Sequence, residues 1–318
     1  MAKADGVIRL GSRGSKLALW QAEFVQGAVA RRTGRAVEVV KIKTTGDVIL
    51  DVPLAKVGGK GLFTKEIEEA LLAGAVDLAV HSMKDVPTDL PPGLEIAVVT
   101  EREDPRDAFL SNTVKRFDDL PKGAKVGTSS LRRQTQLLSM RPDLEIGQLR
   151  GNLDSRIRKL DEGRFDAIIL ASAGLRRLGW ADRIVEYLPP EKSLPAIGQG
   201  ALGIEIRSDD DDTRGAVAFL DDRDTALAVR AERAFLRRLM GGCQVPIGAY
   251  GRTEGHEIAL EGMVGRPDGS EIVRGSRRGP VSGPDALGRA LAEDLLGRGA
   301  AAILSEVYQR PAQGVDVP

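Results

Sequence analysis

The sequence predicts an α/β protein that ends in a small α+β unit. Two observations predict the α/β part: short β-branched strands alternate with helical patterns up to about residue 206, and glycine-containing turns follow several strands. A third observation sets the last hundred residues apart. There, strand-like segments follow one another, and Asp268-Gly269 is a hairpin turn signal. The 318 residues suffice for two or three domains.

The first unit begins with a strand–helix–strand pattern, which favours a parallel sheet. Ser15 is placed to cap a helix whose apolar residues recur at helical spacing, and Gly34 lies near its end. Residues 47–61 have no clear period and predict a mobile loop. The other expected elements are strands at 7–10, 37–42, 76–80 and 94–99 and a helix over 62–73.

The second unit repeats the alternation from about Arg102. Its expected strands are 108–110, 125–127, 144–149 and 165–170, and its expected helices are 130–140, 153–161 and 172–178. Prolines at 189, 190 and 195 then mark a break. A strand at 201–206 follows and could return to the first sheet, and the acidic run 209–212 reads as a solvated loop or a helix start.

The last unit begins with a long helix over about 224–239. Short antiparallel strands are expected at 247–250, 257–263 and 270–274, and helices at 286–296 and 300–308. These breaks predict one domain from residues 1–100 plus 200–218, a second from 101–199 and a third from 219–318.

Composition excludes several classes of protein. Lys plus Arg and Asp plus Glu both number 46, so the net charge is zero, and only 4% of the residues are aromatic. Both values argue against a nucleic-acid-binding protein. One cysteine and two histidines cannot form a disulfide or the usual structural zinc sites, so no metal is predicted. No apolar run approaches a membrane span or a signal peptide, which predicts a cytoplasmic protein without a membrane partner.

Two glycine motifs resemble phosphate-binding loops only superficially. Residues 198–203 match G-x-G-x-x-G, but prolines precede them and a strand overlaps them, so they read as a hinge between domains. Residues 58–61 lack the Ser or Thr that follows the lysine of a P-loop. They indicate a flexible loop, or a lid whose Lys56 and Lys60 contact an anionic ligand.

Basic residues follow the ends of several predicted strands. Arg13 follows the first strand, and Lys84 and Asp85 follow the strand at 76–80, where an extended backbone would point the two to opposite sides. Each residue alone reads as a surface charge or a capped helix. Together they predict a cleft that holds many carboxylates or phosphates, because ligands of open α/β sheets bind at the carboxyl ends of strands. The other members are Thr128, Ser129, Ser130, Arg132 and Arg133 at a helix start, and Arg150, Arg156, Arg176 and Arg177.

Cys243, after two glycines, has two readings. A lone cysteine is usually a small buried hydrophobe. The glycines would also let the backbone approach another domain and expose the sulfur for a covalent role.

Taken together, these segments resemble the hydroxymethylbilane synthase family, also called porphobilinogen deaminase. The resemblance runs in order along nearly the whole chain. The matching segments are 12–15, 17–21, 53–63, 81–87, 101–109, 126–133, 149–152, 194–200 and 241–248.

The resemblance implies a fold and an activity. The fold has two α/β domains like the lobes of periplasmic binding proteins, plus a small α+β domain. Family enzymes join four porphobilinogen units head to tail into hydroxymethylbilane and release ammonia. They use a dipyrromethane cofactor bound through a thioether, and Cys243 matches the attachment position. The family is expected to be monomeric, and the product to pass to a uroporphyrinogen-forming enzyme.

The resemblance also assigns roles to residues. Asp85 matches the catalytic aspartate. Besides Cys243 and Asp85, cofactor contacts are expected from Lys84, Thr128, Ser129, Ser130, Arg132, Arg133 and Arg150. Substrate contacts are expected from Arg13, Ser15, Lys56, Lys60, Arg156, Arg177 and Gln199.

Two other functions compete with this interpretation. A two-lobed anion-binding module would use the lobes and the arginines but would need neither Asp85 nor Cys243. A nucleic-acid-binding protein would use the arginines alone, against the zero net charge.

Overall fold

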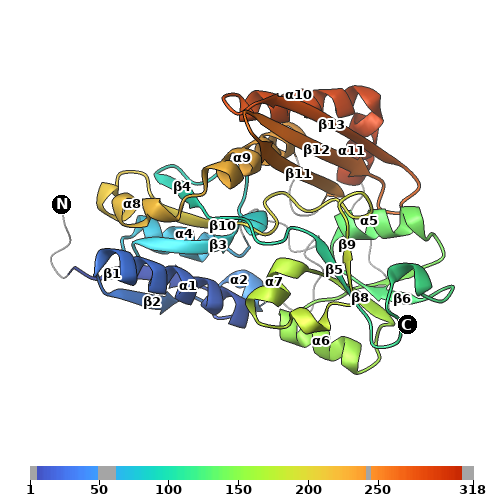
Figure 1. Ribbon diagram of the computed structural model, residues 1–318, viewed down its shortest axis with the longest axis horizontal. Coiled ribbons are helices and arrows are strands. Elements are labelled where there is room, and N and C mark those ends of the chain that lie inside the picture. Colours follow the sequence, from blue (N-terminus) through green and yellow to red (C-terminus); the bar gives the residue numbers. More distant parts are fainter. Residues whose placement is uncertain (1–5, 49–61, 241–244, 310–318) are drawn as a thin grey trace.

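The computed structural model describes residues 6–48, 62–240 and 245–309. In these residues the strands form three sheets, two with five strands and one with three. Figure 1 shows the two larger sheets at opposite ends of the molecule, with the three-stranded sheet and its helices packed above them. The fold class predicted from the sequence is confirmed.

The first sheet has the order β2-β1-β3-β10-β4. Strands β1, β2 and β3 are parallel, while β10 runs antiparallel to both of its neighbours, so the sheet is mixed rather than purely parallel. The chain thus returns to the first sheet through β10, as the sequence indicated. The strands are β1 (Ile8–Ser12), β2 (Val37–Lys41), β3 (Leu78–Ser82), β4 (Leu94–Val99) and β10 (Leu202–Arg207).

Helices cover both faces of this sheet. Helix α1 (Lys16–Thr33) packs Ala22, Val25 and Val29 against β1 and β3. Its first turn is capped by Ser15, which accepts a hydrogen bond from the amide of Ala18. Helix α4 (Lys65–Leu72) packs Ile67 and Leu71 on the other face.

The loop predicted at 47–61 is only partly within the described residues. Residues 45–48 form a short helix, α2 (Thr45–Val48), rather than the predicted loop start. Residues 49–61, with Lys56 and Lys60, lie outside the described residues.

The second sheet has the order β7-β6-β8-β5-β9. Strand β5 is antiparallel to both neighbours, and β6 pairs in parallel with β7 and β8. The sequence did not predict β9, because three residues are too short for a visible alternation. The elements are β5 (Asp107–Leu110), β6 (Lys125–Gly127), α5 (Leu131–Met140), β7 (Glu145–Gly147), α6 (Leu153–Asp161), β8 (Ala167–Ala171), α7 (Ser172–Arg177) and β9 (Glu186–Leu188).

The antiparallel sheet β11-β12-β13 packs against α9 and α10. Its core includes Phe235 of α9, Leu260 and Leu291, all essentially inaccessible to solvent. The strands are longer than predicted, because an antiparallel sheet can keep one charged face in water. The elements are α9 (Arg223–Arg238), β11 (Ile247–Glu254), β12 (Glu257–Gly265), β13 (Ile272–Pro280), α10 (Pro284–Leu295), the π-turn η5 (Leu296–Ala300) and α11 (Ala301–Gln309).

Short helices complete the fold. The acidic run at 209–212 starts helix α8 (Asp211–Val217), because Asp210 accepts a hydrogen bond from the amide of Thr213. This settles the choice between loop and helix start. The single 3₁₀ turns are η1 (Met83–Asp85), η2 (Phe117–Asp119), η3 (Ala181–Arg183) and η4 (Ala218–Leu220).

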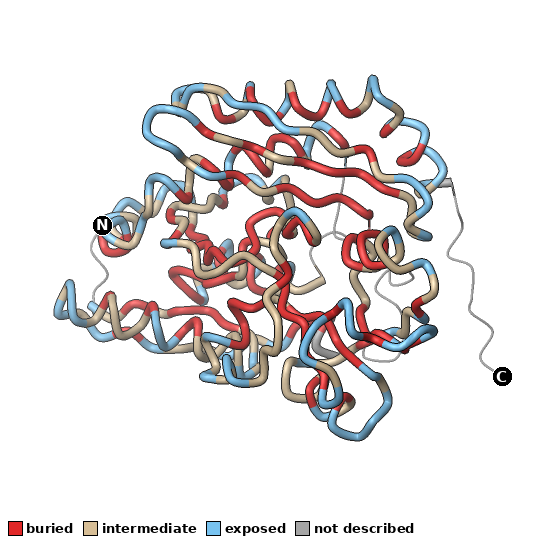
Figure 2. Tube along the Cα trace, turned by 45° about the vertical axis from the view of Figure 1, so that its right-hand side comes forward, coloured by how far each residue is buried: buried red, intermediate tan, exposed pale blue. Residues whose placement is uncertain are grey.

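The glycine motif at 198–203 joins the sheets and opens no helix, since it runs into β10. A Cβ at Gly200, whose φ is +96°, would lie 2.3 Å from the Glu103 carbonyl oxygen. Buried Glu232 of α9 fixes this segment. Its carboxylate accepts a hydrogen bond from the Gly198 amide at 2.6 Å and forms an ion pair with Arg102 at 2.7 Å. Figure 2 shows buried chain running through the middle of the molecule between the sheets. No described helix meets the length and apolarity that crossing a membrane requires.

Candidate active site

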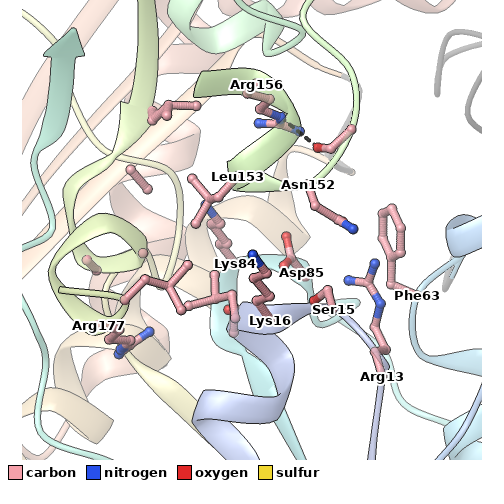
Figure 3. A pocket seen from close by; sticks show the side chains of 18 of the residues that line it. Arg13, Ser15, Lys16, Phe63, Lys84, Asp85, Asn152, Leu153, Arg156 and Arg177 are labelled. Carbon is pink, nitrogen blue, oxygen red and sulfur yellow. Dashed lines mark hydrogen bonds between the residues drawn. The ribbon is translucent and has the colours of Figure 1, made fainter. Parts of the chain in front are cut away.

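A cavity of about 550 Å³ lies where the loops that follow the strands of the two larger sheets meet. The carboxyl ends of parallel strands bind ligands in open α/β sheets, so this is the position that the strand pattern predicted. Ten of the predicted site residues line the cavity: Arg13, Ser15, Lys84, Asp85, Ser129, Arg133, Arg150, Arg156, Arg177 and Gln199. Figure 3 shows several of them around Asp85.

Lys84 and Asp85 both face this cavity, although they are adjacent in sequence. The expectation that they point to opposite sides assumed an extended backbone and is wrong. Strand β3 ends at Ser82, and residues 83–85 form the 3₁₀ turn η1 in place of extended backbone, so both side chains reach the cavity. Burial lowers the pKa of Lys84 to about 8, an effect that Asp85 partly offsets.

Arg13 enters the cavity from the loop after β1. Its guanidinium carbon lies 4.2 Å from the centre of the Phe63 ring, a cation–π distance. Phe63, the second described residue after the undescribed segment 49–61, lines the same cavity. The contact holds the Arg13 guanidinium at the cavity wall.

Four arginines come from the second sheet and its helices: Arg133, Arg150, Arg156 and Arg177. Arg156 donates to the Gly151 carbonyl at 2.8 Å, and Arg177 to the Gly200 carbonyl at 2.6 Å. Burial lowers the pKa of both to about 10, so both stay charged at neutral pH. These are fixed cations rather than mobile surface charges.

Asp107, the first residue of β5, holds three of the predicted site residues in place. Its carboxylate pairs with Arg132 at 2.8 Å and with Arg133 at 2.7 Å, and it accepts a hydrogen bond from Gln199 at 2.9 Å. Burial alone would raise the pKa of Asp107, but the two arginines hold it well below its ordinary value. Arg132 also donates to the Leu194 carbonyl.

Four described residues predicted at the cleft do not line the cavity: Arg176, which pairs with Glu103 at 2.8 Å, and three residues at the start of α5, Thr128, Ser130 and Arg132. Arg132 is only 3% exposed and faces Asp107. Ser130 caps α5 by accepting from the Arg133 amide, and Thr128 accepts from the Ser130 amide. All three therefore shape the helix start that carries Arg133.

Sequence reasoning missed several cavity residues. Lys16, Lys41, Lys43, Phe63, Asn152 and Asp154 also line the cavity. Lys41 is the last residue of β2 and Lys43 follows it; a position at a strand end is the signal that identified the arginines, so the same argument could have found both lysines.

A further missed residue is Arg233 of α9, which contacts the chain just after Asp85. Its guanidinium donates to the Val86, Pro87 and Thr88 carbonyls at 3.0, 2.5 and 3.2 Å. The α+β unit thus fixes the segment that carries Asp85.

Cys243 lies outside the described residues, as do Lys56 and Lys60. In the part of the chain that the structure describes, no three His, Cys, Asp or Glu side chains are grouped to hold a metal ion.

Comparisons with known proteins identify the family. The model for "Porphobilinogen deaminase, dipyromethane cofactor binding domain" matches residues 8–215, and the model for the C-terminal domain of porphobilinogen deaminase matches 226–297. Porphobilinogen deaminases from Geobacter metallireducens and Geobacter sulfurreducens are each 60% identical to this chain over 304 residues, covering 95% of both chains in each pair.

The chain belongs to the porphobilinogen deaminase family. It is an enzyme that polymerises porphobilinogen into hydroxymethylbilane and uses a dipyrromethane cofactor, as the sequence resemblance implied. Among solved structures, the methionine-binding protein MetQ is similar, with a TM-score of 0.45 and 18% identity over 68% of this chain and 89% of that chain. A putative methionine-binding lipoprotein from Bacillus subtilis has a TM-score of 0.43 and 13% identity over 69% and 91% of the two chains.

The cavity of this porphobilinogen deaminase fits a carboxylated pyrrole cofactor. Nine basic side chains line it among the described residues, against the two carboxylates of Asp85 and Asp154. A dipyrromethane with acetate and propionate groups would complement this charge. Lys84, Ser129, Arg133 and Arg150 are the predicted cofactor contacts that have access to it.

Proposed function

We propose that this cavity is the active site for head-to-tail joining of porphobilinogen and that Asp85 is its catalytic carboxylate. One observation carries the proposal: Asp85 lies, next to Lys84, in a cavity lined by nine basic side chains. Most of these side chains suit the carboxylates of the substrate, whereas Asp85 suits a positive charge.

The basic side chains bind and orient the substrate. Each porphobilinogen carries an acetate and a propionate, and an arginine fork can bind a carboxylate through two hydrogen bonds. Such charge-assisted hydrogen bonds contribute roughly 1.5–3 kcal/mol each. Arg13, Arg156 and Arg177 line the cavity as substrate contacts, with Ser15 and Gln199 beside them. Lys56 and Lys60 would add two cations from the neighbouring segment.

Asp85 stabilises the positive charge of the reaction. When the C–N bond of the protonated aminomethyl group of porphobilinogen breaks, ammonia leaves with the bonding electron pair, and the methylene carbon stays on the pyrrole, which becomes cationic. The carbon–carbon bond then forms, and the attacked ring loses a proton. A carboxylate held near the pyrrole N–H favours the charged species over the neutral substrate, which lowers the barrier.

Cys243 is the proposed attachment point of the cofactor, through a thioether. The bound dipyrromethane supplies the pyrrole end to which the first substrate unit is joined. Lys84, Ser129, Arg133 and Arg150 would hold its carboxylates and rings, and Thr128, Ser130 and Arg132 act through the start of α5. The short chain between α9 and β11 contains Cys243.

The remaining expectations are part of the same proposal. Domain limits at 1–100 plus 200–218, 101–199 and 219–318 are supported by the presence of β10 in the first sheet. We also propose a cytoplasmic, monomeric enzyme whose product passes to a uroporphyrinogen-forming enzyme. The single cysteine of the sequence suits a reducing compartment.

Intact mass under denaturing conditions tests the function and the attachment together. Wild-type protein should carry an adduct equal to two porphobilinogen units less two ammonia, and Cys243→Ser should carry none. An unmodified wild-type mass, still unmodified after incubation with porphobilinogen, would favour the binding module without catalysis.

A further inference from the structure

Three lysines form an unassigned group at the cavity. Lys16 is the first residue of α1, Lys41 is the last residue of β2, and Lys43 follows two residues later. All three line the cavity and all three are exposed. We call this group the lysine rim; Figure 3 shows Lys16 with Lys84 and Asp85.

The lysine rim has charge without a partner in the fold. No ion pair joins Lys16, Lys41 or Lys43 to any carboxylate in residues 6–48, 62–240 and 245–309. Elsewhere the described arginines are largely paired, as Arg9 is with Asp77 and Arg102 with Glu232. Three like charges at one edge repel each other, and an anionic ligand relieves that repulsion.

The number of carboxylates requires more cations than the predicted site supplies. Dipyrromethane and four added units make six rings, and two carboxylates per ring make about a dozen, each suited to a charge-assisted bond. Among the described residues, six predicted cations line the cavity: Arg13, Lys84, Arg133, Arg150, Arg156 and Arg177. Even with Lys56 and Lys60, which lie outside the described residues, the predicted cations are fewer than the carboxylates. The lysine rim supplies three more cations.

Arginine and lysine side chains suit different tasks in this cavity. The arginines of the second sheet are half-buried or buried, and Arg133, Arg156 and Arg177 are fixed by hydrogen bonds to the protein. Such fixed forks suit carboxylates that keep one position, which are those of the resident cofactor and of the substrate unit held for reaction. The exposed rim lysines are flexible point charges that can follow a moving carboxylate and release it.

We propose that the lysine rim is a subsite for the carboxylates of the pyrrole units added late, and not for those of the resident cofactor. This rests on the proposed function of the cavity. It predicts that loss of the rim impairs chain extension while cofactor assembly continues.

The test compares two triple variants with the same change in net charge. One combines Lys16→Met, Lys41→Met and Lys43→Met. The control combines Lys65→Met, Lys115→Met and Lys122→Met, which remove three exposed lysines away from the cavity. Each holoenzyme receives a few equivalents of porphobilinogen, and intact mass gives the fraction of covalent complexes that carry one, two, three or four units.

Both variants should carry the cofactor adduct. The rim variant should show a several-fold loss of the complexes with three and four units relative to the control, and a KM raised about tenfold, as three exposed ion pairs would allow. Its KM should also respond less steeply to added KCl than that of the wild type.

Three outcomes would overturn the proposal. A distribution equal to that of the control would show that the rim does not hold the extended chain. A raised KM with an unchanged distribution would assign the rim to capture of incoming porphobilinogen instead. Absence of the adduct from wild type and control alike would overturn the proposed function itself, and is distinguishable because it precedes any extension.

Discussion

The two five-stranded sheets have the same pattern of strand directions, although β10, the last strand of the first sheet along the chain, corresponds to β5, the first strand of the second. Equivalent strands lead into different chemistry. In both, an edge strand and two inner strands run parallel, and an antiparallel strand and a second edge strand follow. Strand β1 corresponds to β6, and each leads into a helix capped by a serine, Ser15 and Ser130. Strand β3, however, ends in the turn of Lys84 and Asp85, whereas its equivalent β8 leads into α7 and Arg177.

Equivalent positions in the two sheets therefore carry residues with different roles. The shared pattern of strand directions brings the ends of equivalent strands to one cavity. The first sheet contributes Asp85, Arg13, Lys84 and the lysine rim, and the second contributes four arginines. The two lobes are therefore not interchangeable: the first carries the proposed catalytic carboxylate and the exposed lysines, whereas the described cations of the second that line the cavity are all arginines.

The antiparallel strands β5 and β10 occupy equivalent positions in the two sheets, and each carries a buried carboxylate. Substitution of the one on β5 is expected to have the largest effect on stability. Strand β5 carries Asp107 between two buried arginines, and β10 carries Glu205, which bonds to His81 at 2.8 Å. Asp107→Asn should lower the free energy of unfolding by about 3–5 kcal/mol, because it leaves two buried guanidinium groups without a countercharge. Chemical denaturation measures this.

Two variants serve as references for Asp107. Glu205→Gln should cost less, because a neutral histidine can still share a hydrogen bond with the amide. Asp161→Asn removes an exposed pair with Arg183 and should cost under about 1 kcal/mol. Equal losses of unfolding free energy for Asp107→Asn and Asp161→Asn would contradict the conclusion that Asp107 provides the countercharge of two buried arginines.

Arg233 tests whether the Asp85 segment of the first lobe depends on the third unit. Arg233→Gln removes donors to three carbonyls and should reduce kcat roughly 10–10²-fold, because small displacements of a reacting group are costly. KM should change less than kcat, and the cofactor adduct should remain. Arg238→Gln, on the same helix but paired with Glu293 of α10, is the control; an equal loss in both variants would refute a specific positioning effect.

Lys84 is expected to have a smaller effect, on the pH dependence of cofactor acquisition. Its pKa is about 8, so the charged form dominates below that pH and is lost as pH rises through it. Cofactor acquisition by apoenzyme should therefore slow several-fold between pH 7 and 9. Lys84→Arg stays charged and should lose this alkaline limb, as intact mass over time would show. If cofactor acquisition by Lys84→Arg slowed equally between pH 7 and 9, deprotonation of Lys84 would be excluded as the cause of the slowing.

Much of this site could be predicted from the sequence, because strand ends are visible as short β-branched runs followed by turn residues. Arg13, Lys84, Arg150 and Arg177 were found in this way, as was the helix start at Ser130. The role of Asp85 came from the family resemblance rather than from spacing.

The rest depended on tertiary contacts that leave no local signal. Asp107 reads as the start of an ordinary strand, and only the packing of α5 against β5 shows that it pairs with Arg132. Arg233 reads as one charge among many on α9. The turn at 83–85 was predicted as extended, because three residues are too few to show a helical period.

The most direct measurement compares the turnover of Asp85→Asn with that of Asp154→Asn, since Asp154 is the other carboxylate among the described residues that line the cavity. Both variants should carry the cofactor adduct by intact mass. Asp85→Asn should turn over at least ~10²-fold more slowly than wild type, and Asp154→Asn should stay within a few-fold of it. Near-normal turnover by Asp85→Asn would contradict its role as the carboxylate that stabilises the developing cation.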